Sequence, residues 1–200
     1  MHAWGGGTGD ERHRVLAKAL ARYGLWDHLP AGARAAAEAE VADGGYPLRF
    51  DLLHGQVEFF ADGEELAEGG VVRFLRSIAP ALARYGLTLH AQAAPPADGD
   101  HPDDYVVAVN GVRCTVLRRA DLEDGRDFWT PATVRPLAVV NRLLAGAAAS
   151  PVRAHTLYAG GNDGLLLLLD PRAVAAMRAS GLFPDHELPE LATEQTQDAR

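Results

Sequence analysis

The sequence predicts an α+β fold: an antiparallel sheet built from hairpins, with helices packed on one face and a helical pair at the N-terminus. Apolar residues recur at helical spacing before residue 46. After it, the order strand, helix, strand, strand occurs twice, as two βαββ-like units. The strongest local signal is Asn110-Gly111, a residue pair typical of two-residue hairpin turns, between two valine-rich runs.

Two helices are expected at the N-terminus. Thr8 and Glu11 have the spacing of a capping box, and the apolar stripe that follows ends at Gly24, which is suited to a left-handed C-cap. Pro30 is a favourable first-turn residue and predicts the start of a second, alanine-rich helix.

The next segments predict a hairpin and a long helix. Apolar and polar residues alternate over 48–52 and 57–59, and His54-Gly55 between them is suited to a turn. Helical spacing then extends over 71–85 and contains Pro80, which should kink or break the helix.

The remaining segments predict a strand, two helices and a third hairpin. A strand is expected over 87–93, and Thr130 followed by proline predicts the N-cap of a helix. Residues 152–169 predict a third hairpin, and Asp170 followed by proline predicts the cap of a last helix.

These elements give one expected domain over residues 8–183, with the helical pair at 8–45 and the sheet with its helices at 46–183. Residues 1–7 are expected to be a flexible leader. Residues 184–200 are expected to be a solvated acidic tail. The two βαββ-like units share little sequence, so simple topology explains their recurrence better than duplication does.

Composition excludes several functional classes. The 19 Lys+Arg against 27 Asp+Glu give a net charge of −8, which disfavours nucleic-acid binding. The longest run of large apolar residues, 165–169, is far shorter than the about 18 residues that span a membrane. The lone Cys114 cannot form an internal disulfide, and no secretory signal is evident. A bacterial cytoplasmic protein is therefore expected; its oligomeric state is not predicted.

The acidic residues gather in two loops, which we interpret as a candidate surface for binding a basic protein. The first loop follows residue 61 and the second follows residue 97. The candidate partner-binding residues are Asp62, Glu64, Glu65, Glu68, Asp98, Asp100, Asp103 and Asp104.

An alternative candidate is the turn at 159–164, a ligand-binding turn formed by Gly160, Gly161, Asn162 and Asp163. Its glycines would let the backbone approach a ligand closely, although a hairpin turn favours the same residues for their positive φ angles.

No catalytic residue, metal site or cofactor is predicted. The histidines lack metal-ligand spacing. Cys114 shares a strand face with Val112 and Val116, which indicates burial, and His155 shares parity with Leu157, which indicates a core histidine.

The sequence therefore favours a non-enzymatic protein-binding or inhibitor protein, similar to small acidic immunity proteins, that presents its acidic loops to a basic partner. The alternative is a small enzyme or ligand-binding module centred on the 159–164 turn and the acidic loops.

Overall fold

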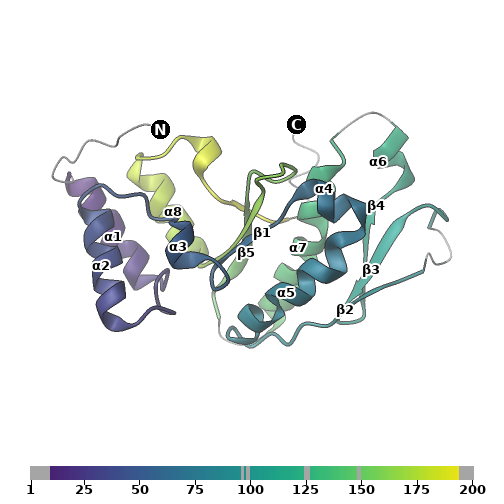
Figure 1. Ribbon diagram of the computed structural model, residues 1–200, viewed down its shortest axis with the longest axis horizontal. Helices are drawn as coiled ribbons and strands as arrows, with labels where there is room; N and C mark the ends of the chain where they lie inside the picture. Colours follow the sequence, from purple (N-terminus) through teal and green to yellow (C-terminus); the bar gives the residue numbers. More distant parts are fainter. Residues whose placement is uncertain (1–9, 96, 98–99, 124–126, 148–149, 194–200) are drawn as a thin grey trace. The chain divides into compact units, whose positions relative to one another are not determined.

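The structure is a computed structural model that describes residues 10–95, 97, 100–123, 127–147 and 150–193. Helices and antiparallel strands confirm the α+β class (Figure 1). The chain forms two compact units. Unit 1 comprises the residues up to Glu58 together with Leu169–Leu188, and unit 2 comprises Phe59–Leu168 and the residues from Pro189 onwards.

Unit 1 is helical. Its elements are α1 (Glu11–Arg22), α2 (Ala31–Ala42), α3 (Phe50–Leu53), α8 (Pro171–Ser180) and the short helix η2 (Asp185–Glu187). Helix α1 contacts both α2 and α8. The buried side chains include Leu16 and Leu20 of α1, Val41 of α2 and Met177 of α8. The apolar stripe of α1 therefore faces the interior, as its spacing predicts.

The helix ends of unit 1 follow the expected chemistry with one correction. Asp10, not Thr8, caps α1: its Oδ1 accepts the backbone N–H groups of Arg12 at 2.9 Å and His13 at 3.2 Å. The side-chain hydrogen bond from Arg12 also helps to hold the pKa of Asp10 at about 2. Thr8 lies outside the described residues. The negative charge of the Asp10 carboxylate also favours the positive end of the helix.

The expected hairpin over 48–59 is wrong in its first half, because residues Phe50–Leu53 form α3. Leu53 is fully buried while Phe50 is 47% exposed, so the alternating pattern does not mark one buried face. The backbone N–H of His54 donates to the carbonyl oxygen of Phe50 at 2.9 Å, which closes a helical turn. Over four or five residues, helical spacing and strand alternation place apolar residues in similar positions.

Unit 2 contains two sheets rather than one. The first has the strand order β1-β6-β5-β7 and the second has the order β2-β3-β4. The strands are β1 (Glu58–Phe60), β2 (Ala91–Ala93), β3 (Tyr105–Val109), β4 (Val112–Leu117), β5 (Arg153–Leu157), β6 (Leu165–Leu169) and β7 (Glu190–Leu191).

Within the segment expected to be a solvated tail, β7 pairs antiparallel with β5, and its neighbours Leu188 and Ala192 are buried. The strand expected over 87–93 is restricted to β2.

The β3–β4 hairpin confirms the expected turn. Asn110 and Gly111 have φ angles of +49° and +80°, and Val109 pairs with Val112 on either side of them. The Asn110 side chain also accepts the backbone N–H of His90 at 2.7 Å and donates to the Thr88 carbonyl oxygen at 2.8 Å. Asn110 thus forms part of the turn and also binds the adjacent segment at Thr88 and His90.

The helical elements of unit 2 are α4 (Gly63–Glu65), η1 (Leu66–Gly70), α5 (Val71–Ala83), α6 (Arg119–Glu123) and α7 (Trp129–Gly146). Helix α7 contacts both β4 and β5, and α5 contacts β2. Helix α5 continues through Pro80 without a break. Pro80 lies on the exposed face, where water can reach the carbonyl that loses its helical partner. No described helix is long and apolar enough to cross a membrane.

Candidate functional site

In the first acidic loop, two carboxylates have partners in the structure and two have none among the described residues. Asp62 caps α4 by accepting the backbone N–H of Glu65 at 3.1 Å. Glu65 itself forms an ion pair with Arg73 at 2.5 Å. Glu64 and Glu68 are exposed and pair with no described residue. Two of the four predicted carboxylates therefore pair with no described residue, and a third, Asp62, caps a helix.

The 159–164 turn packs against this loop. The backbone N–H of Ala61 donates to the Gly164 carbonyl oxygen at 2.7 Å, and that of Gly63 donates to Gly161 at 3.1 Å. A Cβ atom on Gly63 would lie 2.9 Å from the Cα atom of Gly160. The turn and the start of α4 are thus in backbone contact, and the first acidic loop and the alternative ligand turn form one surface.

The start of α7 lies against the same turn. A Cβ atom on Gly160 would lie 2.8 Å from the backbone nitrogen of Thr130, and the Thr130 hydroxyl donates to the Ala159 carbonyl oxygen at 3.2 Å. Gly160 also has a φ angle of +82°. Close packing and backbone conformation together account for this glycine without a ligand.

The sequence prediction of Thr130 as the N-cap of α7 is wrong. The N-cap position is held by Phe128, and Asp127 just before it accepts the backbone N–H groups of Trp129 at 3.0 Å and Thr130 at 3.1 Å with its Oδ1. The helix begins one residue before Thr130. The Thr130 hydroxyl donates to the Asp127 carboxylate and to the 159–164 turn, so its side chain is used for tertiary contacts.

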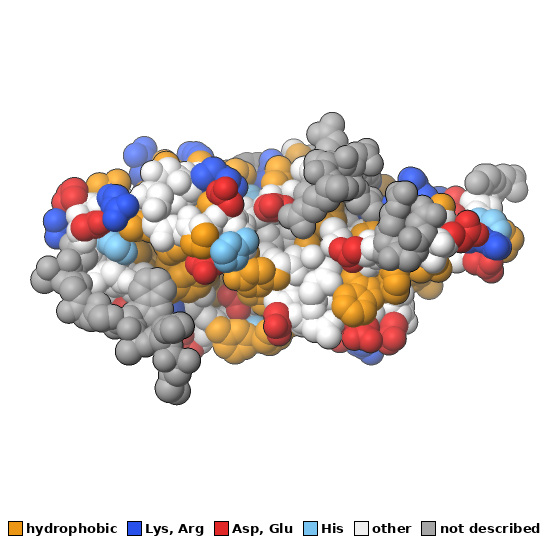
Figure 2. Space-filling model, turned by 90° about the horizontal axis from the view of Figure 1, so that it is seen from above, with side chains coloured by type: hydrophobic (Ala, Val, Ile, Leu, Met, Phe, Trp, Pro, Cys, Tyr) orange, Lys and Arg blue, Asp and Glu red, His pale blue; other side chains and the backbone are white. Residues whose placement is uncertain are grey.

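Three chain segments therefore meet at one place in unit 2, and we call their outward-facing residues the acidic corner. Figure 2 shows hydrophobic and acidic side chains next to each other in the region around α4. The segments contain no lysine or arginine over residues 60–65, 127–130 and 158–164. The acidic corner consists of Phe60, Asp62, Glu64, Asp127, Trp129, Tyr158 and Asp163.

The aromatic residues of the corner are unusually accessible. Phe60 is 55% exposed and Tyr158 is 48% exposed, while Trp129 is partly buried. Tyr158 has a φ angle of +56°, a left-handed conformation that is uncommon for a bulky residue. Such a conformation costs roughly 1–3 kcal/mol in folding. A glycine would relieve this cost but would remove the exposed ring.

The described carboxylates of the second acidic loop all have partners in the structure. Asp100 forms an ion pair with Arg113 at 2.5 Å, and Asp103 lies 3.4 Å from Arg119. The Asp104 carboxylate accepts the backbone N–H of Arg119 at 2.8 Å. At the right-hand side of Figure 2, where this loop lies, acidic, basic and histidine side chains are mixed.

These contacts lower the charge that the second loop presents to a partner. The pKa of Asp100 is lowered by the backbone N–H of Ala97 and then by Arg113. Asp98 lies outside the described residues. The structure therefore joins the first loop with the 159–164 turn, and it gives the carboxylates of the second loop partners of their own.

The other residues considered for chemistry occupy structural positions. Cys114 is 6% exposed and His155 is 2% exposed, so both burial predictions are confirmed. The His155 ring nitrogen Nδ1 lies 3.0 Å from the Arg153 carbonyl oxygen. Within the described part of the chain, no cluster of three or more His, Cys, Asp or Glu residues could hold a metal ion.

Sequence reasoning missed a buried carboxyl group in β1. Glu58 is 2% exposed, and no described residue forms a hydrogen bond or an ion pair with its side chain. Burial raises its pKa. The sequence shows Glu58 as the polar residue between Val57 and Phe59, which indicates a solvent-facing position, and no local signal marks it as buried.

Three members of the acidic corner were also missed as partners of the first loop. Asp127 precedes Thr130 by three residues, a spacing that fits a helix cap, so this signal was present in the sequence. The roles of Tyr158 and Trp129 depend on the docking of the 159–164 turn against α7, which local sequence does not encode. Comparisons with protein-family models, curated proteins and solved structures give no match.

Proposed function

We propose that this chain is a non-enzymatic protein-binding protein that contacts a basic partner through the acidic corner. In its most specific form, the proposal is that binding inhibits the partner, as small acidic immunity proteins inhibit toxins. The support is the combination of carboxylates with accessible aromatic rings on one surface. Aromatic anchors surrounded by charges are typical of protein-binding surfaces.

The single observation that carries the proposal is Tyr158. Its ring is half exposed, and its backbone occupies a conformation that glycine would adopt at lower cost. A large side chain kept at an unfavourable position on the surface contributes little to folding. A large ring at this half-exposed position is suited to contact with a partner, because tyrosine is enriched among the residues that dominate binding energy.

The charges of the acidic corner support a basic partner in particular. Glu64, Asp127 and Asp163 are exposed, and no lysine or arginine occurs in the three segments that form the corner. Carboxylates arranged in this way attract a positively charged surface during encounter and accelerate association. The effect extends over about 8–10 Å at physiological salt and is screened at higher salt.

In this proposal, the second acidic loop contributes less than the first to attracting the partner. Its described carboxylates are engaged by Arg113 and Arg119, so a basic partner would have to displace those arginines. The first loop therefore supplies most of the attraction, together with Asp127 and Asp163.

The experiment begins with affinity capture on the wild-type chain and identification of the retained protein. The same capture uses a neutral-corner variant, which combines Asp62→Asn, Glu64→Gln, Asp127→Asn and Asp163→Asn. Asparagine still caps a helix, so the ends of α4 and α7 are preserved. A control variant removes four charges from unit 1 through Glu11→Gln, Glu38→Gln, Asp43→Asn and Asp185→Asn. A basic protein retained by the wild type and the control, and lost from the neutral-corner variant, is the expected result.

Association kinetics with the captured protein then test the mechanism. At low salt, the neutral-corner variant should associate at least about tenfold more slowly than the control, and the difference should shrink near 1 M salt. Tyr158→Ala should mainly accelerate dissociation. Equal association rates for the two charge variants, or a captured partner without a basic surface, would contradict the proposal.

A further inference from the structure

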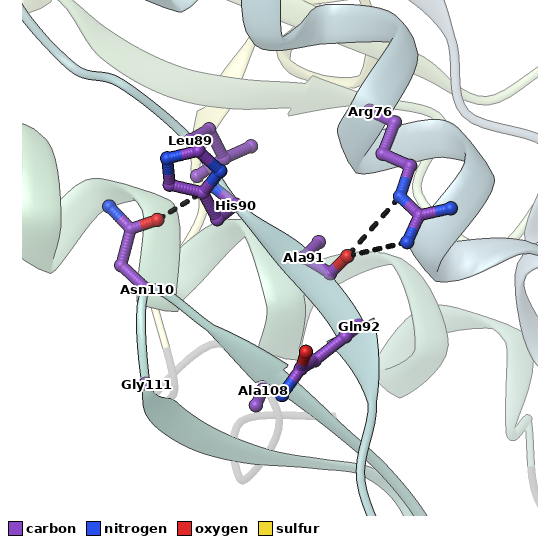
Figure 3. Close-up of a pocket in the computed structure, with 8 residues that line it drawn as sticks. All are labelled: Arg76, Leu89, His90, Ala91, Gln92, Ala108, Asn110 and Gly111. Atoms are coloured by element: carbon purple, nitrogen blue, oxygen red, sulfur yellow. Dashed lines mark hydrogen bonds between the residues drawn. The ribbon is translucent and has the colours of Figure 1, made fainter.

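A hollow of about 650 Å³ opens beside β2, in a part of unit 2 that the acidic corner does not use (Figure 3). Its volume is within the range of about 300–1,000 Å³ that is typical of small-molecule sites. Arg76 of α5 lies on one side, and Asn110-Gly111 of the β3–β4 turn lies on the other. The remaining lining residues are Leu89, His90, Ala91, Gln92 and Ala108. No carboxylate lines the hollow.

The register of β2 explains how Arg76 is held. The backbone N–H of Asn110 donates to the His90 carbonyl oxygen at 2.8 Å, and Ala91 is paired with Val109. Hydrogen-bonded and non-hydrogen-bonded pairs alternate in antiparallel strands, so the carbonyl of Ala91 points away from β3. Arg76 fills this position: its Nε and Nη2 donate to the Ala91 oxygen at 3.3 and 3.1 Å (Figure 3).

This anchoring leaves half of the guanidinium available. Arginine has five N–H donors, and two of them hold the Arg76 side chain on Ala91. The edge formed by Nη1 and the second N–H of Nη2 has no partner among the described residues. A guanidinium fixed by one edge loses little entropy when the other edge binds a ligand.

Arg76 differs in this respect from the other arginines of unit 2 that the structure shows in ion pairs. Those side chains already have a carboxylate partner within 3.5 Å. The pairs are Arg73 with Glu65, Arg113 with Asp100, Arg119 with Glu123 and Arg135 with Asp121. Arg76 is thus an anchored arginine in a hollow that no carboxylate lines.

We propose that this hollow binds a small molecule that carries a carboxylate group. The open edge of Arg76 matches the two oxygens of a carboxylate in a bidentate arrangement. Gln92 lies in β2 and His90 directly precedes the strand, so the two residues flank Ala91, and their side chains lie on one face and supply additional donors. A phosphate dianion would place two charges on the group beside the single permanent cation of the lining, whereas each carboxylate group places only one there, so a carboxylate is the better match.

A substitution in the floor of the hollow tests the site independently of Arg76. Ala108 is paired with Gln92 in β2 and is partly exposed, so its small side chain leaves the space between the strands and the turn open. Ala108→Leu should fill this space and keep Arg76 unchanged. Leucine is tolerated in a strand, and the replacement lies outside the buried core.

The test is titration of the full chain with succinate at constant ionic strength, followed by backbone amide shifts in NMR spectra. The expected result is saturable shifts at His90–Gln92 and Asn110-Gly111. Arg76→Gln should weaken binding at least about tenfold, because hydrogen bonds to charged groups are lost. Arg76→Lys should weaken it less, since charge remains without the planar fork, and Ala108→Leu should abolish it. Arg73→Gln is the matched control on α5 and should leave binding unchanged.

Three results would overturn the proposal. The first is an absence of shifts at these amides at 50 mM succinate, a concentration chosen far above ordinary site affinities. The second is equal succinate binding by Arg76→Gln and Arg73→Gln, provided that the remaining amide spectrum shows both variants folded. The third is tighter binding of inorganic phosphate than of succinate at the same ionic strength, which would assign the hollow to phosphate ligands.

Discussion

Replacement of Gly160 by alanine tests whether the 159–164 turn is a packed connection. Gly160 has a φ angle of +82°, and an added Cβ would lie 2.8 Å from the Thr130 nitrogen. Gly111 offers a matched control, because its φ angle is +80° and an added Cβ would meet nothing within 4 Å. Both glycines lie in hairpin turns of unit 2, so the two replacements share the conformational penalty and differ only in the steric one.

The expected magnitudes follow from these two contributions. An alanine in the left-handed region costs about 1–2 kcal/mol, and this should be the whole effect of Gly111→Ala. Gly160→Ala adds an overpacking cost of about 1–3 kcal/mol, because the clash is with backbone atoms. At about 2–4 °C per kcal/mol for a chain of this size, Gly160→Ala should melt several degrees lower.

Thermal unfolding, monitored by circular dichroism and calorimetry, measures both variants. The chain has two compact units, so the comparison uses the thermal transition that both substitutions shift. Equal melting temperatures for Gly160→Ala and Gly111→Ala would refute the close packing of the turn against α7. Equal melting temperatures would also favour the alternative interpretation, in which the 159–164 turn binds a ligand.

Three further outcomes are expected. Cys114 should react with a thiol reagent only after denaturation, because its side chain is buried in β4, and rapid modification of the native protein would contradict this. Glu58→Gln should raise the melting temperature at pH 7–8. Burial raises the folded-state pKa of Glu58, so the wild-type protein is most stable at low pH, where this carboxyl group is protonated, and loses stability as pH rises through that pKa. The gain in melting temperature from Glu58→Gln should therefore vanish near pH 4. Thermal scans across pH measure it. Asp121→Asn should cost about 1–3 kcal/mol in urea unfolding, since it removes the charge from the carboxylate that accepts from Arg135, and an unchanged free energy of unfolding would show that this pair is dispensable.

The fold class was predictable because several local signals were strong. The Asn110-Gly111 turn, the Asp170 cap and the left-handed Gly24 and Gly181 all occur where residue chemistry alone dictates the backbone. Helix α5 was also clear, since its apolar spacing extends over more than three turns. In each case the information lies within a few neighbouring residues.

The incorrect predictions concern segments whose structure depends on tertiary contacts. Residues Phe50–Leu53 fit two periodicities, and burial of Leu53 selects the helix. The division of strands between two sheets depends on which strands pair, and the partner of β1 is β6, about a hundred residues later. β7 consists of two residues, too few for any sequence pattern.

The candidate site was predictable only in part. The first acidic loop and the 159–164 turn are both candidates in the sequence, but no local pattern shows that they are in contact. Their contact depends on the hydrogen bonds of Ala61 and Gly63 to the turn. The ion pairs that neutralise the second loop join Asp100 to Arg113 and Asp103 to Arg119, across β3 and β4, and are equally invisible in a local reading.

The most direct test of the acidic corner is a map of where a basic peptide binds. Titration with hexa-arginine at low salt, followed by backbone amide shifts, compares the wild-type chain with the neutral-corner variant. Shifts concentrated in residues 60–65, 127–130 and 158–164, and lost in that variant, are the predicted result. Shifts centred on residues 100–104, or spread evenly over the acidic surface of both units, would contradict the assignment of the acidic corner as the binding surface.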